Sequence, residues 1–169
     1  MRGRLNKSPK NLGFDSKRQI ARCFIFHHFS IFPIFATKGI KLEEYNYQDI
    51  EVITEEIFKA MGCPADDAHQ ISKILLRADL RGVNTHGLMR LPEYYRLRKL
   101  DKINVKPVIR ILHQTPSTTL LDADKALGMV AGSRAMTMAI EKARRVGTGW
   151  AAVRNSNHFG IAGAYAMMA

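Results

Sequence analysis

Apolar residues recur every three or four positions between residues 45 and 80, which is the period of an amphipathic helix. A first helix is predicted from a cap at Asn46 to a stop at Gly62. Its broad apolar face holds Tyr47, Ile50, Ile53, Ile57, Phe58 and Met61. A second helix starts at Pro64 and stops at Gly82. Its apolar line holds Ala68, Ile71, Ile74, Leu75 and Ala78. A third helix is expected over about residues 87–100, beginning or kinking at Pro92.

The pattern changes beyond residue 107, where short apolar runs predict strands over 108–113 and 117–122. A long helix follows over about 129–146, and the apolar run 150–154 is typical of a buried strand. Residues from 161 onward begin a helix that is apolar nearly all round and therefore needs a cover. We expect the start of a larger fold, truncated at its C-terminal end.

This order of elements predicts an α/β protein built from three segments. Residues 1–42 are a basic extension, residues 43–106 a helical segment, and residues 107–169 the incomplete start of a mixed αβ domain.

The net charge of +11 is concentrated at the N-terminus, where residues 1–41 hold nine Lys/Arg and one acid. The remaining residues hold 17 bases and 14 acids. Because the composition changes sharply at Glu43, we expect residues 1–42 to be poorly ordered and foreign to the folded unit, for example an extension from a misplaced start. An acid-poor, Arg-bearing arm also fits an organellar targeting peptide, and nucleic-acid binding by the arm is a further alternative.

The two cysteines, Cys23 and Cys63, have no CxxC spacing, which argues against a disulfide framework and favours a reducing, cytoplasmic location. The longest apolar stretch, residues 23–36, is interrupted by two histidines, a serine and a proline. We therefore expect no membrane span.

The stretch Gly147-Thr148-Gly149-Trp150-Ala151-Ala152 fits the loose dinucleotide pattern G-x-G-x-x-A. That pattern works only with a strand before the glycines and a helix after them. Here the predicted helix comes first and the strand second, so a Rossmann fold is rejected. None of the six histidines has the helical spacing with glutamate that a zinc site uses, so no metal is predicted.

Two histidines in loops are the candidates for chemistry. His158 follows a predicted strand, and open α/β sheets bind ligands beyond the carboxyl ends of their strands. His86 lies four residues before Arg90, so a helix would put both on one face. A proton donor beside an arginine that holds a carboxylate is what reduction of a 2-oxo acid requires. For either histidine, structural hydrogen bonding is the ordinary alternative.

Two motifs resemble those of the malate/L-lactate dehydrogenase family, which also holds ureidoglycolate, sulfolactate and diketogulonate enzymes. The first is Asp79-Leu80-Arg81-Gly82-Val83-Asn84-Thr85-His86-Gly87-Leu88-Met89-Arg90-Leu91-Pro92-Glu93-Tyr94, and the second is Val153-Arg154-Asn155-Ser156-Asn157-His158-Phe159-Gly160. The resemblance covers about residues 45–169. It implies a dimeric oxidoreductase that uses NAD or NADP and has a cofactor domain unlike the Rossmann fold.

By position in these motifs, the resemblance implies a role for several residues. His158 and His86 are the candidates for proton exchange, and the family uses one or the other. Arg90, Thr85 and Tyr94 match substrate-binding positions, with Thr85 standing where serine is usual. His86, Asn157, His158, Phe159 and Gly160 match the cofactor side of the site. Family members are about twice as long as the matched region.

These observations predict the N-terminal portion of a dehydrogenase that moves a hydride between a nicotinamide and a small 2-hydroxy or 2-oxo acid. The expected partners are a small carboxylate and a second copy of the complete protein, with no membrane and no nucleic acid. The alternatives are a catalytically inert fragment and a nucleic-acid-binding protein acting through residues 1–42.

Overall fold

The computed structural model describes residues 20–21 and 45–169. In it, strand β1 (Ile20–Ala21) pairs antiparallel with strand β2 (Tyr45–Asn46). The other expectations about residues 1–42 lie outside the described residues.

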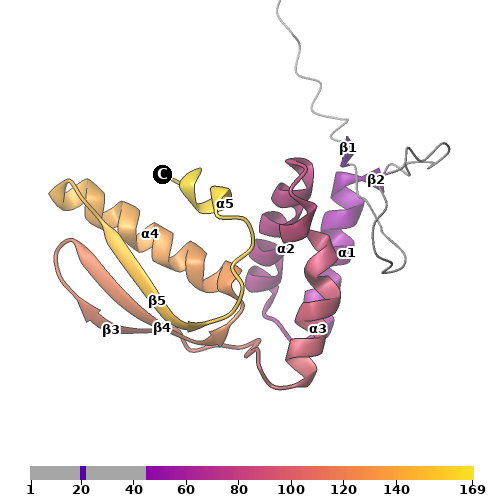
Figure 1. Ribbon diagram of the computed structural model, residues 1–169, viewed down its shortest axis with the longest axis horizontal. Helices are drawn as coiled ribbons and strands as arrows, with labels where there is room; N and C mark the ends of the chain where they lie inside the picture. Colours follow the sequence, from indigo (N-terminus) through magenta and orange to yellow (C-terminus); the bar gives the residue numbers. More distant parts are fainter. Residues whose placement is uncertain (1–19, 22–44) are drawn as a thin grey trace, which may run out of the picture.

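Three helices form one half of the molecule (Figure 1). Helix α1 (Tyr47–Ala60) is capped by Asn46, whose side chain accepts a hydrogen bond from the amide of Gln48 at 2.8 Å. Helix α2 (Ala65–Leu80) follows Pro64 and carries acids in its first turn, which favours that end of the helix dipole. Helix α3 (Leu91–Lys99) has a proline in its first turn, where the missing amide hydrogen is harmless.

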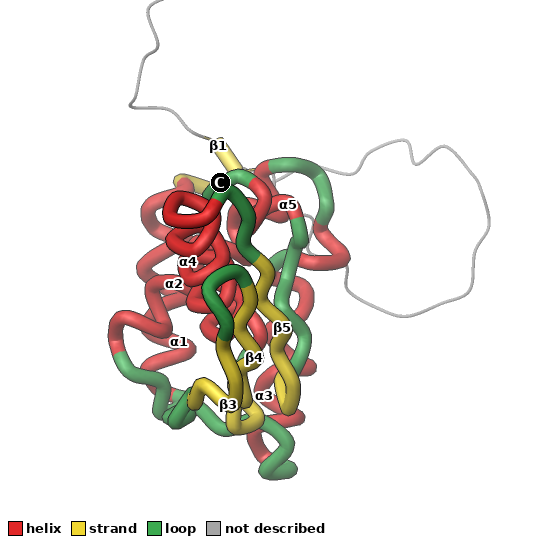
Figure 2. The backbone as a smooth tube through the Cα atoms, turned by 90° about the vertical axis from the view of Figure 1, so that its left-hand side faces the viewer, coloured by secondary structure: helices red, strands yellow, loops and turns green. Residues whose placement is uncertain are grey.

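The other half is a three-stranded sheet in the order β3-β4-β5, with a helix over one face (Figures 1 and 2). Strands β3 (Arg110–Gln114) and β4 (Thr118–Ala126) are antiparallel, whereas β4 and β5 (Trp150–Ser156) are parallel. Helix α4 (Gly128–Val146) makes the connection between the parallel strands and ends at Gly147, which has a φ of 85°. Since α4 precedes the two glycines and β5 follows them, the rejection of a Rossmann motif is confirmed.

One apolar core joins the two halves. It collects side chains from all three helices of the first half and from the start of α4, and its largest fully buried members include Tyr94, Phe58, Ile71, Leu75 and Met129. The short helix α5 (Gly163–Ala166) adds Ala164 to this core. None of the helices in the described ranges is long and apolar enough to cross a membrane.

Three details of the predicted elements were wrong. The expected helix over 87–100 is broken: two 3₁₀ turns, η1 (Asn84–His86) and η2 (Leu88–Arg90), precede α3, so His86 and Arg90 do not share a helix face. Strand β5 is mostly exposed instead of buried, because it is an edge strand of the described sheet. On α1, Ile53 and Ile57 face outward and the buried positions are Thr54 and Phe58.

Candidate active site

The site lies where two parallel strands end side by side. Beyond the end of β5, the backbone amide of Asn157 donates to the carbonyl oxygen of Ala126, the last residue of β4, at 3.0 Å. The side-chain amide of Asn157 donates to the carbonyl oxygens of Lys125 at 2.8 Å and Lys102 at 3.2 Å. The amide of Gly128 in turn donates to the carbonyl oxygen of His158 at 3.1 Å. These bonds fix the backbone that carries His158 to both β4 and the start of α4.

The imidazole of His158 is held by two partners on one nitrogen. The hydroxyl of Tyr94 lies 2.8 Å from Nδ1, and the amide of Gly160 donates to the same nitrogen at 3.2 Å. Tyr94 is 1% exposed, so its ring lies in the core and only its hydroxyl reaches the His158 ring. Because Nδ1 faces these partners, Nε2 is the nitrogen left to exchange a proton with a ligand.

His86 is brought next to His158 from a separate segment. The two ring centroids are 5.4 Å apart, although the residues are far apart in the sequence. The hydroxyl of Thr85 lies 3.0 Å from Nδ1 of His86. Nε of Arg90 donates to the carbonyl oxygen of Thr85 at 2.7 Å, which leaves both terminal nitrogens of that guanidinium as donors.

Burial and the neighbouring charges lower the pKa of His158. Its pKa lies below the ordinary value of 6.5, first because partial burial disfavours the charged ring and then because of the nearby Arg90 and His86. Burial also raises the pKa of the Tyr94 hydroxyl to about 12. At neutral pH the site therefore holds a neutral His158 and a protonated Tyr94.

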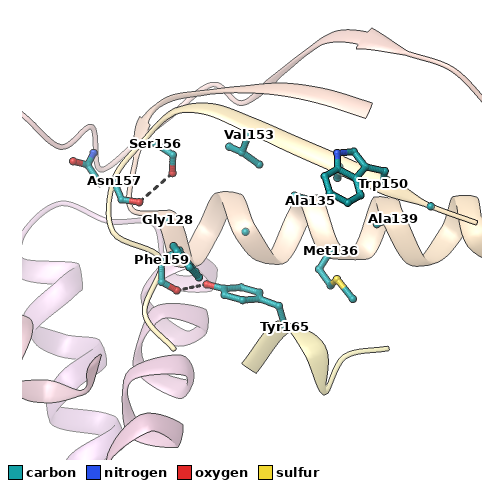
Figure 3. A pocket seen from close by; sticks show the side chains of 13 residues that line it. Gly128, Ala135, Met136, Ala139, Trp150, Val153, Ser156, Asn157, Phe159 and Tyr165 are labelled. Carbon is teal, nitrogen blue, oxygen red and sulfur yellow. Dashed lines mark hydrogen bonds between the residues drawn. The ribbon is translucent and has the colours of Figure 1, made fainter. Parts of the chain in front are cut away.

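An apolar groove of about 510 Å³ adjoins this cluster between α4 and β5 (Figure 3). Asn157 and Phe159 line it at the end nearest His158, and Gly128 and Gly132 line its α4 side. A Cβ added to Gly128 would lie 2.3 Å from the carbonyl oxygen of Asn157, so only glycine lets α4 approach the loop this closely. Grooves of this volume accept small organic ligands or parts of larger ones.

The candidate residues predicted from the sequence lie around one site, and the structure shows what several of them contact. Tyr94, predicted to bind substrate, is buried against His158. The side-chain amide of Asn157, predicted on the cofactor side, is committed to backbone carbonyl oxygens. Gly160 is buried with a φ of 74° and contacts His158 through its amide. Phe159 is 49% exposed and open to a ligand.

One contributing residue was missed. Tyr165 donates a hydrogen bond from its hydroxyl to the carbonyl oxygen of Phe159, and its ring rests on Gly132 (Figure 3). A lone hydroxyl in an otherwise apolar run was the only signal for it in the sequence.

Comparison with known proteins places most of the chain in one family. Residues 45–169 match the family model described as malate/L-lactate dehydrogenase. The L-sulfolactate dehydrogenase of Methanocaldococcus jannaschii is 45% identical over 114 residues, which cover 68% of this chain and 33% of that protein. The malate dehydrogenase of Pyrococcus abyssi is 48% identical over 113 residues, which cover 67% of this chain and 31% of that protein.

Solved structures show the same fold. The sulfolactate dehydrogenase from Methanocaldococcus jannaschii superposes with a TM-score of 0.71 at 41% identity, covering 72% of this chain and 36% of that one.

A more distant sequence relative is the (2R)-3-sulfolactate dehydrogenase (NADP(+)) of Chromohalobacter salexigens. It is 31% identical over 117 residues, which cover 69% of this chain and 35% of that protein. This chain spans about a third of the length of these relatives.

Proposed function

Since the chain belongs to the malate/L-lactate dehydrogenase family, we propose that it forms the substrate end of an oxidoreductase acting on a small 2-hydroxy or 2-oxo acid. The observation that carries this proposal is the meeting of His86, His158 and Arg90, which come from two distant segments. A proton-exchanging group lies beside a guanidinium whose two terminal nitrogens are available as donors. This pair fits a substrate with a carboxylate next to its reacting carbon.

His158 exchanges the proton of the substrate hydroxyl. The lowered pKa keeps the ring neutral before reaction. Oxidation uses the tautomer with its hydrogen on Nδ1, in which the hydrogen bond from the Gly160 amide to that nitrogen is given up and Nε2 is free to take the substrate proton as the hydride leaves C2. The resulting imidazolium donates its Nδ1 hydrogen to the Tyr94 hydroxyl, which lies 2.8 Å away. In the reduction direction the same atoms return the proton to the oxygen at C2.

Arg90 binds the substrate carboxylate through its two terminal nitrogens. Its Nε is already bonded to the Thr85 carbonyl oxygen, so the guanidinium is held in place before substrate arrives. The Thr85 hydroxyl lies 3.0 Å from Nδ1 of His86 and so helps to orient that ring. His86 remains the rival for proton exchange, because it stands in ring contact with His158.

A nicotinamide cofactor, NAD or NADP, supplies the hydride acceptor when bound. The groove beside His158 supports this assignment because its walls combine apolar surface with an exposed phenylalanine at the end nearest that histidine. Phe159 and the backbone of Asn157 and Gly160 form the end of that groove or adjoin it, with His86 and His158 beyond them. These residues are assigned to the cofactor side of the site.

The complete protein is further proposed to be a cytoplasmic homodimer. Support for a second copy comes from α1, where Val52 and Ile53 are 60% and 54% exposed although both are apolar. An inert fragment remains the alternative for this chain alone. A nucleic-acid-binding role would rest on residues 1–42, most of which lie outside the described ranges.

Binding of L-malate, followed by NMR on the side-chain signals of Arg90 and His158, tests the carboxylate site. We expect saturable chemical-shift changes on adding L-malate. Arg90→Lys should weaken the apparent affinity at least tenfold, because lysine keeps the charge but cannot bind a carboxylate through two nitrogens. Arg96→Lys is the matched control, because Arg96 is exposed on α3 and paired with Glu93. Shifts that are identical in both variants, or that persist with uncharged dimethyl malate, would contradict the proposal.

A further inference from the structure

A buried carboxylate stands behind the loop that carries His86 and Arg90. Asp79 lies in the last turn of α2 and is 5% exposed. A negative charge at the C-terminal end of a helix is unfavourable to the helix dipole. Burial is unfavourable as well, and it raises the pKa of the Asp79 carboxyl. The requirements of α2 therefore do not explain why an acid stands at this position.

The partners of Asp79 show what it does. Oδ1 accepts a hydrogen bond from the side-chain amide of Asn84 at 3.1 Å, and Oδ2 accepts one from the backbone amide of Leu88 at 2.8 Å. These two residues flank the tripeptide Thr85-His86-Gly87. One carboxylate thus ties down both ends of the stretch that includes the candidate histidine.

The backbone between those ends runs directly against the carboxylate. A Cβ added to Gly87 would lie 2.1 Å from Oδ1 of Asp79, so this contact exists only because residue 87 has no side chain. The segment consists of two 3₁₀ turns, and no residue of either turn is fully buried. Leu88 packs against the core from a partly buried position, and the hydrogen bonds to Asp79 add the polar contacts that hold the rest of this loop.

We propose that Asp79 is a positioning residue, which fixes His86 and Arg90 through its hydrogen bonds to Asn84 and Leu88. The inference that this geometry serves substrate binding rests on the proposed function. The positioning of the loop itself is tested without substrate or cofactor.

The test uses NMR on the 169-residue chain, with amide exchange at Leu88 and the Nε signal of Arg90 as readouts. With Asp79→Ala, we expect exchange at Leu88 to speed up at least tenfold, and the Arg90 and His86 signals to shift or broaden. Asp79→Asn is the conservative rescue: its oxygen still accepts from Leu88, and its amide donates to a flipped Asn84. Protection at Leu88 should then stay within about threefold of the parent chain.

Two further variants separate positioning from general loss of stability. Asp67→Asn makes the same charge change in the first turn of α2, where the carboxyl is also partly buried, and should leave Leu88 and Arg90 unchanged. Gly87→Ala should speed up exchange at Leu88 as Asp79→Ala does, because the added methyl group pushes the carboxylate away. Combining the two substitutions should then speed up exchange at Leu88 no further.

Equal acceleration at Leu75 in the middle of α2 would mean that Asp79 only stabilises the helix, and would overturn the proposal. So would unchanged exchange at Leu88 in both Asp79 variants. If the loop responds as expected but L-malate does not bind, the positioning role stands and the proposed function fails.

Discussion

The helical half and the sheet half of this chain differ in how far they are buried. In the helical half, Phe58, Ile71 and Leu75 are 0% exposed and share one core with Tyr94. In the sheet half, every residue of β3 is exposed, and Trp150 at the start of β5 is 70% exposed. The helices bury one face in the core that they share with the start of α4, whereas the sheet presents apolar surface at an edge strand. The candidate site lies between the two, with Tyr94 from the buried half supporting His158 from the exposed half.

The largest expected difference is in stability. Phe58→Ala should lower the free energy of unfolding by about 3–5 kcal/mol, because it empties a fully buried position. Trp150→Ala should change it by less than about 1 kcal/mol, since most of that larger ring already contacts solvent. Urea unfolding followed by far-UV circular dichroism measures both. Similar losses from the two variants would mean that the halves are equally packed.

A second difference is expected in local opening. Amides in the middle of β5, such as those of Ala152 and Val153, should exchange at least tenfold faster than those of Ile71 and Leu75 in α2. Native-state hydrogen exchange by NMR gives the ratio directly. Matched protection in β5 and α2 would show that the sheet half is as well covered as the helical half.

The link between the halves can be weakened without disturbing the core. Tyr94→Phe keeps the buried ring and removes the hydroxyl that contacts His158, so it should cost about 0.5–1.5 kcal/mol of stability. The imidazole signals of His158 should change at the same time, while those of the remote His113 stay in place. Tyr95→Phe on the exposed face of α3 is the control. If His158 signals do not respond, the hydrogen bond does not form in solution.

The smallest expected effect is a dependence of stability on pH. Because the pKa of His158 is lowered in the folded state, folding favours the neutral ring. Stability should therefore fall as the pH drops from about 6.5, the ordinary value, through the lowered pKa, and His158 should contribute no further change below it. His158→Gln should remove this component. If the urea midpoints of the parent chain and of His158→Gln fall equally between pH 8 and 5, the pH dependence comes from another group.

The helix ends of this fold that depend on local residues could be predicted from the sequence. The cap at Asn46, the second helix after Pro64 and the left-handed stop at Gly147 each depend on neighbouring residues, so local chemistry determines them. The exposure of β5 was not readable, because an apolar strand looks the same at an edge as in the middle of a sheet.

The sequence predicted which residues gather at the site, but not how they are arranged there. The two motifs contain His86, Arg90 and His158, but the prediction that His86 and Arg90 share one helix face was wrong, since they lie in two separate 3₁₀ turns that precede α3. Their proximity to His158 comes from tertiary packing: α3 and the start of α4 share one core, and the amide of Gly128 at the start of α4 donates to the carbonyl oxygen of His158. Tyr94 gave no sign in the sequence that its hydroxyl would be buried against that histidine.

The central claim is that His158 exchanges the proton and Arg90 holds the carboxylate. Its most direct test is a chimaera in which residues 45–169 replace the matching third of the Methanocaldococcus jannaschii L-sulfolactate dehydrogenase, with kcat and KM measured for each variant. We predict that His158→Ala lowers kcat by about a hundredfold to ten-thousandfold, and that Arg90→Lys acts mainly on KM. His86→Ala should leave kcat within about tenfold of the parent chimaera. A full loss with His86→Ala and normal turnover with His158→Ala would contradict the account.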